Sequence, residues 1–226
     1  MRILLIRHGQ TQGNIDARIQ GPDDELTDLG REQAQLLAAH VAATYKIDHL
    51  VSSALSRARE TAEIIASRTG HEISLEPRFA EIHNGTAIGM LWSDWRLANP
   101  ELAAVWSWDV RHADAAWGGG ESGRDVCRRV FAAWDEIVQA YNGSGRTVAI
   151  VSHGGPIAWL AARLNGDSLD VWPGPYGDVA NCSVTEVAIA ANGVGTIERW
   201  NTTDHLGSSY APHISPVIPP VTGKAR

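Results

Sequence analysis

Two stretches of the sequence place a histidine and a glycine directly after a run of apolar residues. Leu4-Leu5-Ile6 precedes Arg7-His8-Gly9, and residues 147–151 precede Ser152-His153-Gly154-Gly155. Short apolar runs of this kind are typical of buried strands. The carboxyl ends of such strands form the edge at which open α/β sheets bind ligands. The sequence therefore predicts that His8 and His153 lie together in one pocket.

Arg7, Arg57 and Glu81 add charge to this predicted pocket. Arg57 falls in the first turn of a predicted helix, where a cation opposes the helix dipole. Such a placement indicates a site that gathers positive charge for an anion, although a single arginine is more often a solvated surface residue. Two histidines and a carboxylate could also bind zinc, but two arginines at the same edge would repel a dication. An anion pocket fits better, and phosphate is the natural guest because arginine forks match its oxygens.

The chemistry that we infer from these residues is phosphoryl transfer to a neutral imidazole, with the arginines stabilising charge on the equatorial oxygens. Glu81 follows apolar residues, and a partly desolvated carboxyl group can protonate a leaving alcohol and later recover a proton from water. Gly154 and Gly155 would expose amides at a helix N-terminus, which is another anion site. The polar loop from Gln10 to Gly21 could wrap an anion, although a surface loop is the simpler interpretation.

Helices and strands along the chain must position these residues. The apolar periodicity predicts a helix over residues 26–45, a second from the end of the next strand to about residue 69, and a long third from 122 to about 141. Pro156 is expected as the first residue of a fourth helix, which Asn165-Gly166 ends. Residues 48–51 read as a strand, 73–81 as a short extended piece, and 179–189 with 194–200 as an antiparallel pair joined at Asn192-Gly193.

Residues 82–120 form an irregular segment that is rich in tryptophan, with helical pieces expected around 91–98 and 100–109. We interpret this segment as a small cap over the edge of the sheet. Its aromatic side chains could hold the organic part of a substrate, but packing of the cap is the more common role for most of them. Beyond His205 the chain is rich in proline, and residues 206–226 are expected to form a flexible tail. Residues 1–205 are therefore predicted to be one domain.

The composition bounds the function further. The 226 residues carry a formal charge of −7, with 44% hydrophobic and 20% charged residues, and the sequence has two cysteines. The negative charge argues against non-specific binding to nucleic acid or to anionic lipid. Two cysteines indicate neither a disulfide framework nor a zinc cluster. No apolar run approaches the roughly 20 residues of a membrane span, so we expect no membrane contact and a cytoplasmic location by default.

Several motifs in order resemble the signature of the histidine phosphatase superfamily, the phosphoglycerate-mutase-like proteins. The likeness runs over roughly residues 1 to 205. The motifs that carry it are Arg7-His8-Gly9-Gln10-Thr11-Gln12-Gly13-Asn14, Gln20-Gly21, Leu26-Thr27-Asp28-Leu29-Gly30, Ser52-Ser53-Ala54-Leu55-Ser56-Arg57-Ala58, Glu81-Ile82-His83-Asn84-Gly85, Gly120-Glu121-Ser122, Ser152-His153-Gly154-Gly155 and Asn181. Ala54 replaces a frequent proline and Glu60 a common glutamine, and neither departure touches the proposed chemistry.

The resemblance implies a three-layer α/β/α sandwich with a mostly parallel sheet, and a reaction that needs no metal or other cofactor. It implies that His8 is the nucleophile that becomes phosphohistidine and that Glu81 is the proton donor. Arg7, Arg57 and His153 would bind the phosphoryl group. Asn14 and the Gly21 loop would assist them.

The family contains phosphatases and mutases, and the resemblance favours a phosphatase. The mutases carry a longer, more basic segment after the acid glutamate, whereas residues 82–120 contain only Arg96 and Arg111 as lysine or arginine. The expected substrate is a small phosphorylated metabolite, namely a sugar phosphate or a phosphoglycerate-type ester, with a glycosylated phosphoglycerate among the candidates. A cofactor-dependent phosphoglycerate mutase is the alternative, followed by a non-catalytic protein that binds a phosphorylated ligand. A homodimer is compatible with the sequence, which does not decide the oligomeric state.

Overall fold

The computed structural model describes residues 1–226 except 106–112, 117, 171–172, 174–175 and 208–226. Its centre is a six-stranded sheet in the order β3-β2-β4-β1-β5-β6. The strands are β1 (Arg2–Arg7), β2 (His49–Ser52), β3 (Ile73–Leu75), β4 (Thr147–Ser152), β5 (Val184–Ile189) and β6 (Gly195–Thr202). The first four are parallel to one another, β5 is antiparallel to β1, and β6 is antiparallel to β5.

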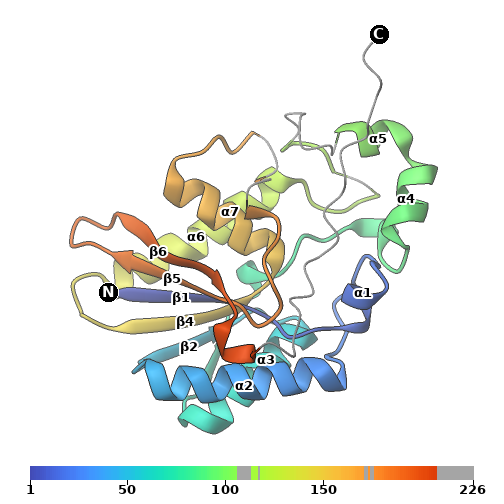
Figure 1. Cartoon of the computed structure of the whole chain (residues 1–226). Helices are drawn as coiled ribbons and strands as arrows, with labels where there is room; N and C mark the ends of the chain where they lie inside the picture. Colours follow the sequence, from blue (N-terminus) through green and yellow to red (C-terminus); the bar gives the residue numbers. More distant parts are fainter. Residues whose placement is uncertain (106–112, 117, 171–172, 174–175, 208–226) are drawn as a thin grey trace.

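Helices cover both faces of the sheet, which gives the expected α/β sandwich (Figure 1). On one face lie α2 (Asp28–Thr44) and α3 (Ser56–Thr69), and on the other lie α6 (Gly123–Tyr141) and α7 (Gly154–Asn165). Alternate side chains of β1 point to opposite faces, as the pleat of a strand requires. Ile3 and Leu5 belong to the core beneath α6 and α7, whereas Leu4 and Ile6 belong to the core beneath α2 and α3.

Local sequence signals set the ends of these helices. The Thr27 side chain accepts the amide of Gly30 at the start of α2, and Ser122 and Asp125 form a capping box at the start of α6. Gly70 and Gly166 end α3 and α7 in the left-handed conformation that glycine adopts without strain. The apolar periodicity that predicted α6 corresponds to one stripe of the helix, with Val126, Val130 and Trp134 buried and Ile137 and Tyr141 packed against the same core.

Three sequence expectations differ from the structure. Helix α7 begins at Gly154, so Pro156 is its third residue and not its first. The strand expected over 179–189 begins only at Val184, because the chain turns at Cys182, which has a φ of 55°. The extended piece expected over 73–81 ends at Leu75 and is followed by the 3-10 helix η1 (Pro77–Phe79).

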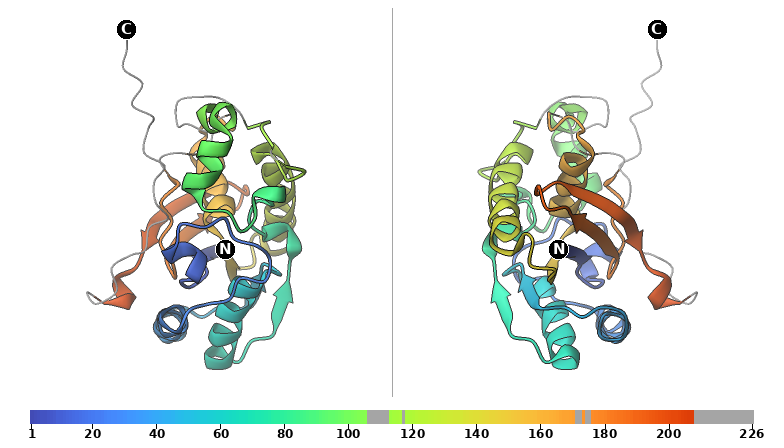
Figure 2. Two further views of the ribbon diagram at one scale, coloured as in Figure 1. Left: turned by 90° about the vertical axis from the view of Figure 1, so that its right-hand side faces the viewer. Right: turned by 90° about the vertical axis from the view of Figure 1, so that its left-hand side faces the viewer.

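The segment after Glu81 lies at the same end of the sheet as the short helix α1 (Gln12–Ile15). This segment contains η2 (Gly85–Ala87), α4 (Trp92–Ala98) and α5 (Pro100–Val105), and α4 lies near α1 at the right of Figure 1 and in the left view of Figure 2. An isolated β-bridge joins Arg18 to Leu91. The rest of the helical piece expected over 100–109 falls outside the described residues. Of the tail expected over residues 206–226, Leu206 is the last residue of η4 (Asp204–Leu206), and residues 208–226 fall outside the described residues.

Some tryptophans of this segment pack in a small cluster, and others lie outside the described residues. Trp95 is buried in a small cluster with Ile19 and Ala87, and Trp92 packs against that cluster. Trp106, Trp108 and Trp117 lie outside the described residues. The packing role is therefore confirmed for Trp95.

Within the described part of the chain, no helix is long and apolar enough to cross a membrane.

Candidate active site

The two predicted histidines meet at the carboxyl ends of adjacent parallel strands. In the register of β1 and β4, Arg7 lies opposite Ser152, so the next residues, His8 and His153, lie side by side. Their ring centroids are 5.1 Å apart with an interplanar angle of 55°. Both are buried, with 2% and 0% of their surface exposed. The expectation that the two imidazoles lie together is confirmed, whereas neither is among the residues that line the pocket described below.

His8 is held as a neutral imidazole with one nitrogen left to react. Its Nδ1 atom lies 2.7 Å from the carbonyl oxygen of Gly9, and because a carbonyl can only accept, Nδ1 carries the hydrogen. Burial lowers the pKa of His8 well below its ordinary value, and the nearby charges of Arg57 and Arg7 lower it further. The lone pair is therefore on Nε2, which is the arrangement that a nucleophilic imidazole needs.

His153 is oriented by a serine. Its Nε2 atom lies 2.8 Å from the hydroxyl oxygen of Ser53. Its Nδ1 atom is buried and has no hydrogen-bond partner within the part of the chain that the structure describes. Burial, then Arg57, His8 and Arg7, lower the pKa of His153 well below its ordinary value. A buried polar atom without a partner costs free energy, so Nδ1 of His153 is a candidate contact for a ligand.

The two arginines place buried positive charge beside the histidines. Arg7 ends β1 and donates from Nη1 to the carbonyl of Val179, and burial lowers its pKa to about 10. Arg57 lies in the first turn of α3, as expected, and donates from Nη1 to the carbonyl of Gly21 at 2.8 Å. It is 1% exposed, and burial lowers its pKa. Because charges this deeply buried need compensation, the site calls for an anion.

Glu81 supplies a carboxylate next to this positive charge. It is partly buried, as the sequence predicted. Its Oε1 atom accepts the amide of Ile82 at 3.0 Å, and Oε2 accepts the amide of Gly155 at 3.2 Å. The amide of Gly155 is therefore taken by Glu81 in this structure. Gly154 lies against Arg7, since a Cβ added to it would be 3.9 Å from Arg7 Nε.

Asn14 and Gly21 brace the site. The Asn14 side-chain oxygen accepts the amide of Thr11 at 3.1 Å and the side-chain amide of Asn181 at 3.2 Å. The carbonyl of Gly21 accepts a hydrogen bond from Arg57, and the amide of Gly21 donates to Asp24 at 2.7 Å. Direct contacts of Asn14 and Gly21 with a phosphate stay a prediction.

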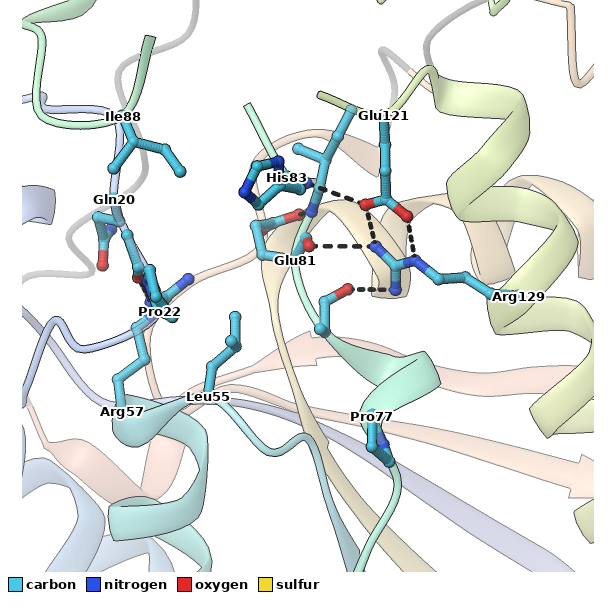
Figure 3. Close-up of a pocket in the computed structure, with 13 residues that line it drawn as sticks. Gln20, Pro22, Leu55, Arg57, Pro77, Glu81, His83, Ile88, Glu121 and Arg129 are labelled. Carbon is cyan, nitrogen blue, oxygen red and sulfur yellow. Dashed lines mark hydrogen bonds and ion pairs between the residues drawn. The ribbon is translucent and has the colours of Figure 1, made fainter. Parts of the chain in front are cut away.

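A pocket of about 280 Å³ opens beside Arg57 and Glu81 (Figure 3). The residues that line it are Gln20, Gly21, Pro22, Leu55, Arg57, Pro77, Ala80, Glu81, Ile82, His83, Ile88, Glu121 and Arg129. His83 lines this pocket. Among the described residues no tryptophan lines it, and Trp106, Trp108 and Trp117 lie outside the described residues. Within the described residues, no group of three or more histidine, cysteine, aspartate or glutamate side chains could hold a metal ion.

Sequence analysis did not recognise the roles of Ser53 and Arg129. Ser53 lies inside a quoted motif, but its contact with His153 joins residues 100 positions apart. Arg129 follows Arg128 on α6, and the two are indistinguishable in a pattern of charges. In the structure Arg129 lines the pocket, whereas Arg128 is exposed. The two arginines differ because consecutive residues of a helix point in different directions.

Comparison with known proteins agrees with this geometry. The chain matches the family model of the histidine phosphatase superfamily (branch 1) over residues 3–203. A glucosyl-3-phosphoglycerate phosphatase of Mycolicibacterium vanbaalenii is 39% identical over 193 residues, which cover 83% of this chain and 84% of the relative. A probable phosphoglycerate mutase of Photorhabdus laumondii is 34% identical, covering 74% of this chain and 75% of the relative. A mycobacterial glucosyl-3-phosphoglycerate phosphatase solved with VO3 has a TM-score of 0.79 at 32% identity, covering 89% of this chain and 99% of that one.

Proposed function

Since the chain belongs to the histidine phosphatase superfamily (branch 1) and is a phosphatase, we propose that it hydrolyses its ester through a phosphohistidine at His8. The observation that carries this proposal is the pair of buried, neutral imidazoles beside two buried guanidinium groups. A neutral imidazole can attack phosphorus, and the cations offset the charge of the transferring group.

The reaction has two steps. In the first, the lone pair on Nε2 of His8 attacks phosphorus while the bond from phosphorus to the ester oxygen breaks, and Glu81 gives a proton to the leaving alcohol. In the second, water attacks the phosphohistidine while the Glu81 carboxylate takes its proton, and the phosphorus–nitrogen bond breaks to release phosphate and neutral His8.

We further propose that the substrate is a glycosylated phosphoglycerate or a related phosphoglycerate-type ester. The support is the relative of Mycolicibacterium vanbaalenii, whose name gives such a substrate. A pocket of about 280 Å³ next to the phosphate site leaves room for an organic group. The test is phosphate release from a panel of glucosyl-3-phosphoglycerate, 3-phosphoglycerate, glucose 6-phosphate and phosphoserine, and equal rates on all four would contradict this choice.

Phosphoglycerate mutase activity is the second candidate, favoured by the relative of Photorhabdus laumondii. A mutase must return the phosphoryl group to a substrate that also carries a carboxylate, which calls for additional cations. Residues 82–120 contain only Arg96 and Arg111 as lysine or arginine. Measurement of both phosphate release and conversion of 3- to 2-phosphoglycerate separates the two activities, and efficient conversion without release would overturn the phosphatase.

Replacement of His8 by alanine tests the nucleophile. We expect His8→Ala to lose turnover by at least about 10⁴-fold, because the covalent path is removed, while circular dichroism and the melting temperature show a folded protein. The unsubstituted enzyme, quenched during turnover, should carry an acid-labile phosphoryl group that His8→Ala lacks. Labelling of His8→Ala at the level of the unsubstituted enzyme would place the nucleophile elsewhere.

A further inference from the structure

The ion pair of Arg129 and Glu121 lies against the loop that carries Glu81. Arg129 of α6 donates from Nε to Oε1 of Glu121 at 2.7 Å and from Nη2 to Oε2 at 2.8 Å, so the pair is bidentate. Glu121 lies just before the start of α6. The two side chains are 19% and 26% exposed, so water screens this pair less than it screens the exposed pairs of the surface.

The guanidinium of Arg129 also reaches three backbone carbonyls, and its contact with Glu81 is drawn in Figure 3. Nη1 donates to the carbonyls of Arg78 at 2.8 Å and Ala80 at 2.6 Å, and Nη2 donates to that of Glu81 at 3.1 Å. A guanidinium has five N–H groups in one plane, and these contacts, with the two to Glu121, supply five acceptors. All of its donors are therefore used within the protein, so Arg129 has none left for a substrate although it lines the pocket.

Glu121 holds the same loop from its other side. Its Oε2 atom accepts the amide of His83 at 2.9 Å, and its backbone amide donates to the carbonyl of His83 at 2.7 Å. The pair thus fixes the chain both before and after Glu81. Residues 80–84 belong to no helix or strand, so no ladder of regular hydrogen bonds fixes this loop.

We propose that Arg129, through its ion pair with Glu121, is the positioning residue for Glu81, and this inference rests on the proposed role of Glu81 as the general acid. A general acid must lie within hydrogen-bond reach of the leaving oxygen, and a displacement of about 1 Å can cost about 100-fold in rate. Arg129 acts through the backbone of residues 78–83 and touches neither the phosphoryl group nor the leaving alcohol.

The test compares Arg129→Gln on two esters. On 3-phosphoglycerate, whose alkoxide leaving group needs a proton, we expect kcat to fall by about 100-fold. On p-nitrophenyl phosphate, whose leaving group barely needs a proton, we expect kcat to fall less than about fivefold. KM should change little on either ester. A merely structural role would lower both values of kcat together.

Three further variants isolate the cause. Glu121→Gln keeps the size of the side chain and is expected to show the same split to a smaller extent, so it serves if Arg129→Gln does not fold. Arg129→Lys keeps the charge but has only three donors on a flexible stem, and it should stay impaired on 3-phosphoglycerate. Arg128→Gln is the matched control, because Arg128 directly precedes Arg129 on α6 and is 74% exposed in a pair with Asp125. Both activities of this variant should be unchanged.

Glu81→Gln supplies the reference for these measurements. If Arg129 acts through Glu81, then Arg129→Gln should add no leaving-group dependence in a Glu81→Gln background. An equal loss on both esters in Arg129→Gln, full rescue by Arg129→Lys, or an additive effect in the double variant would overturn the inference and leave the proposed function standing. Equal losses on both esters in Glu81→Gln itself would overturn the acid role, and with it this inference.

Discussion

At the scale of single residues, the Ser53 hydroxyl is the partner of Nε2 of His153. It lies 2.8 Å from Nε2 and accepts the amide of Leu55 at 3.3 Å. We propose that this hydroxyl donates its one proton to Nε2. The hydrogen of the neutral ring is then on Nδ1, the buried atom that has no partner among the described residues. In this tautomer an uncharged His153 would donate to a phosphoryl oxygen.

Ser53→Ala should therefore weaken phosphate binding without unfolding the protein. Without the serine hydroxyl, the tautomer of His153 is no longer fixed, so its hydrogen bond to phosphate is weakened. Loss of one hydrogen bond of about 1 kcal/mol corresponds to about a fivefold rise in the inhibition constant of inorganic phosphate. The ¹⁵N chemical shifts of His153 should report the change of tautomer. Ser152→Ala is the control, because Ser152 is the neighbouring buried serine and its hydroxyl donates to the carbonyl of Phe79 at 2.8 Å. Unchanged shifts and inhibition in Ser53→Ala would contradict the assignment.

At the scale of elements, two glycines let the start of α2 approach the loop after His8. A Cβ on Gly9 would lie 2.5 Å from the carbonyl oxygen of Gly30, and a Cβ on Gly30 would lie 2.1 Å from that of Gln10. The approach allows Thr27 to donate its amide to the carbonyl of Gln10 at 2.9 Å. Helix α2 therefore supports the loop that holds the His8 ring through the carbonyl of Gly9.

Gly30→Ala is expected to destabilise the protein, although alanine has a higher helix propensity than glycine. Propensity alone would give a gain of up to about 1 kcal/mol in a helix interior. The clash with backbone should instead cost about 1–3 kcal/mol, and displacement of the His8 loop should lower kcat. Urea denaturation measures the free energy of unfolding, and a value equal to or above that of the unsubstituted protein would contradict the close approach.

At the scale of the whole molecule, buried neutral histidines make stability depend on pH. Burial lowers the pKa of His8 and His153 well below the ordinary value and lowers the pKa of His205 to about 4. In the unfolded chain these groups take up protons below about pH 6.5, whereas in the native protein they do not. The unfolded state then binds more protons, so stability falls as the pH drops below about 6.5 and is independent of these groups above about pH 7.5.

Urea denaturation between pH 7.5 and 5 should show this loss. Each fully buried neutral histidine adds a slope of up to about 1.4 kcal/mol per pH unit in this range. His153→Gln removes one such group, so its slope should be smaller by up to that amount. Equal slopes in the two proteins would show that His153 takes up a proton in the native state as well.

The extent of the domain is also decided at this scale, and we propose that residues 1–205 with the adjoining end of η4 form one folding unit. A chain that ends at Gly207 should keep its activity and its free energy of unfolding within about 0.5 kcal/mol. A chain that ends at Thr203 is the contrast, because it removes buried Leu206 and the contact of His205 with the carbonyl of Cys182. It should lose about 2–5 kcal/mol. Equal stability of the two would contradict the proposed boundary.

The sequence by itself determined the features that depend on neighbours along the chain. Apolar runs that end in Arg7-His8 and in His153 predicted the two strands and the imidazoles at their ends, and Gly70 and Gly166 predicted where helices end. These signals are local, because capping, strand patterning and turns are settled within a few residues. The ordered motifs over residues 1–205 likewise pointed to the family.

Only the tertiary structure decided how distant residues meet. The register that pairs Arg7 with Ser152 sets the two rings 5.1 Å apart, and five acceptors from separate segments surround the guanidinium of Arg129 and leave that of Arg128 at the surface. Helix α7 starts at Gly154, where Pro156 was expected to begin it, and the amide of Gly155 in its first turn meets Glu81 from 74 residues away. Contacts of this kind depend on packing among segments far apart in the chain, and no local pattern encodes them.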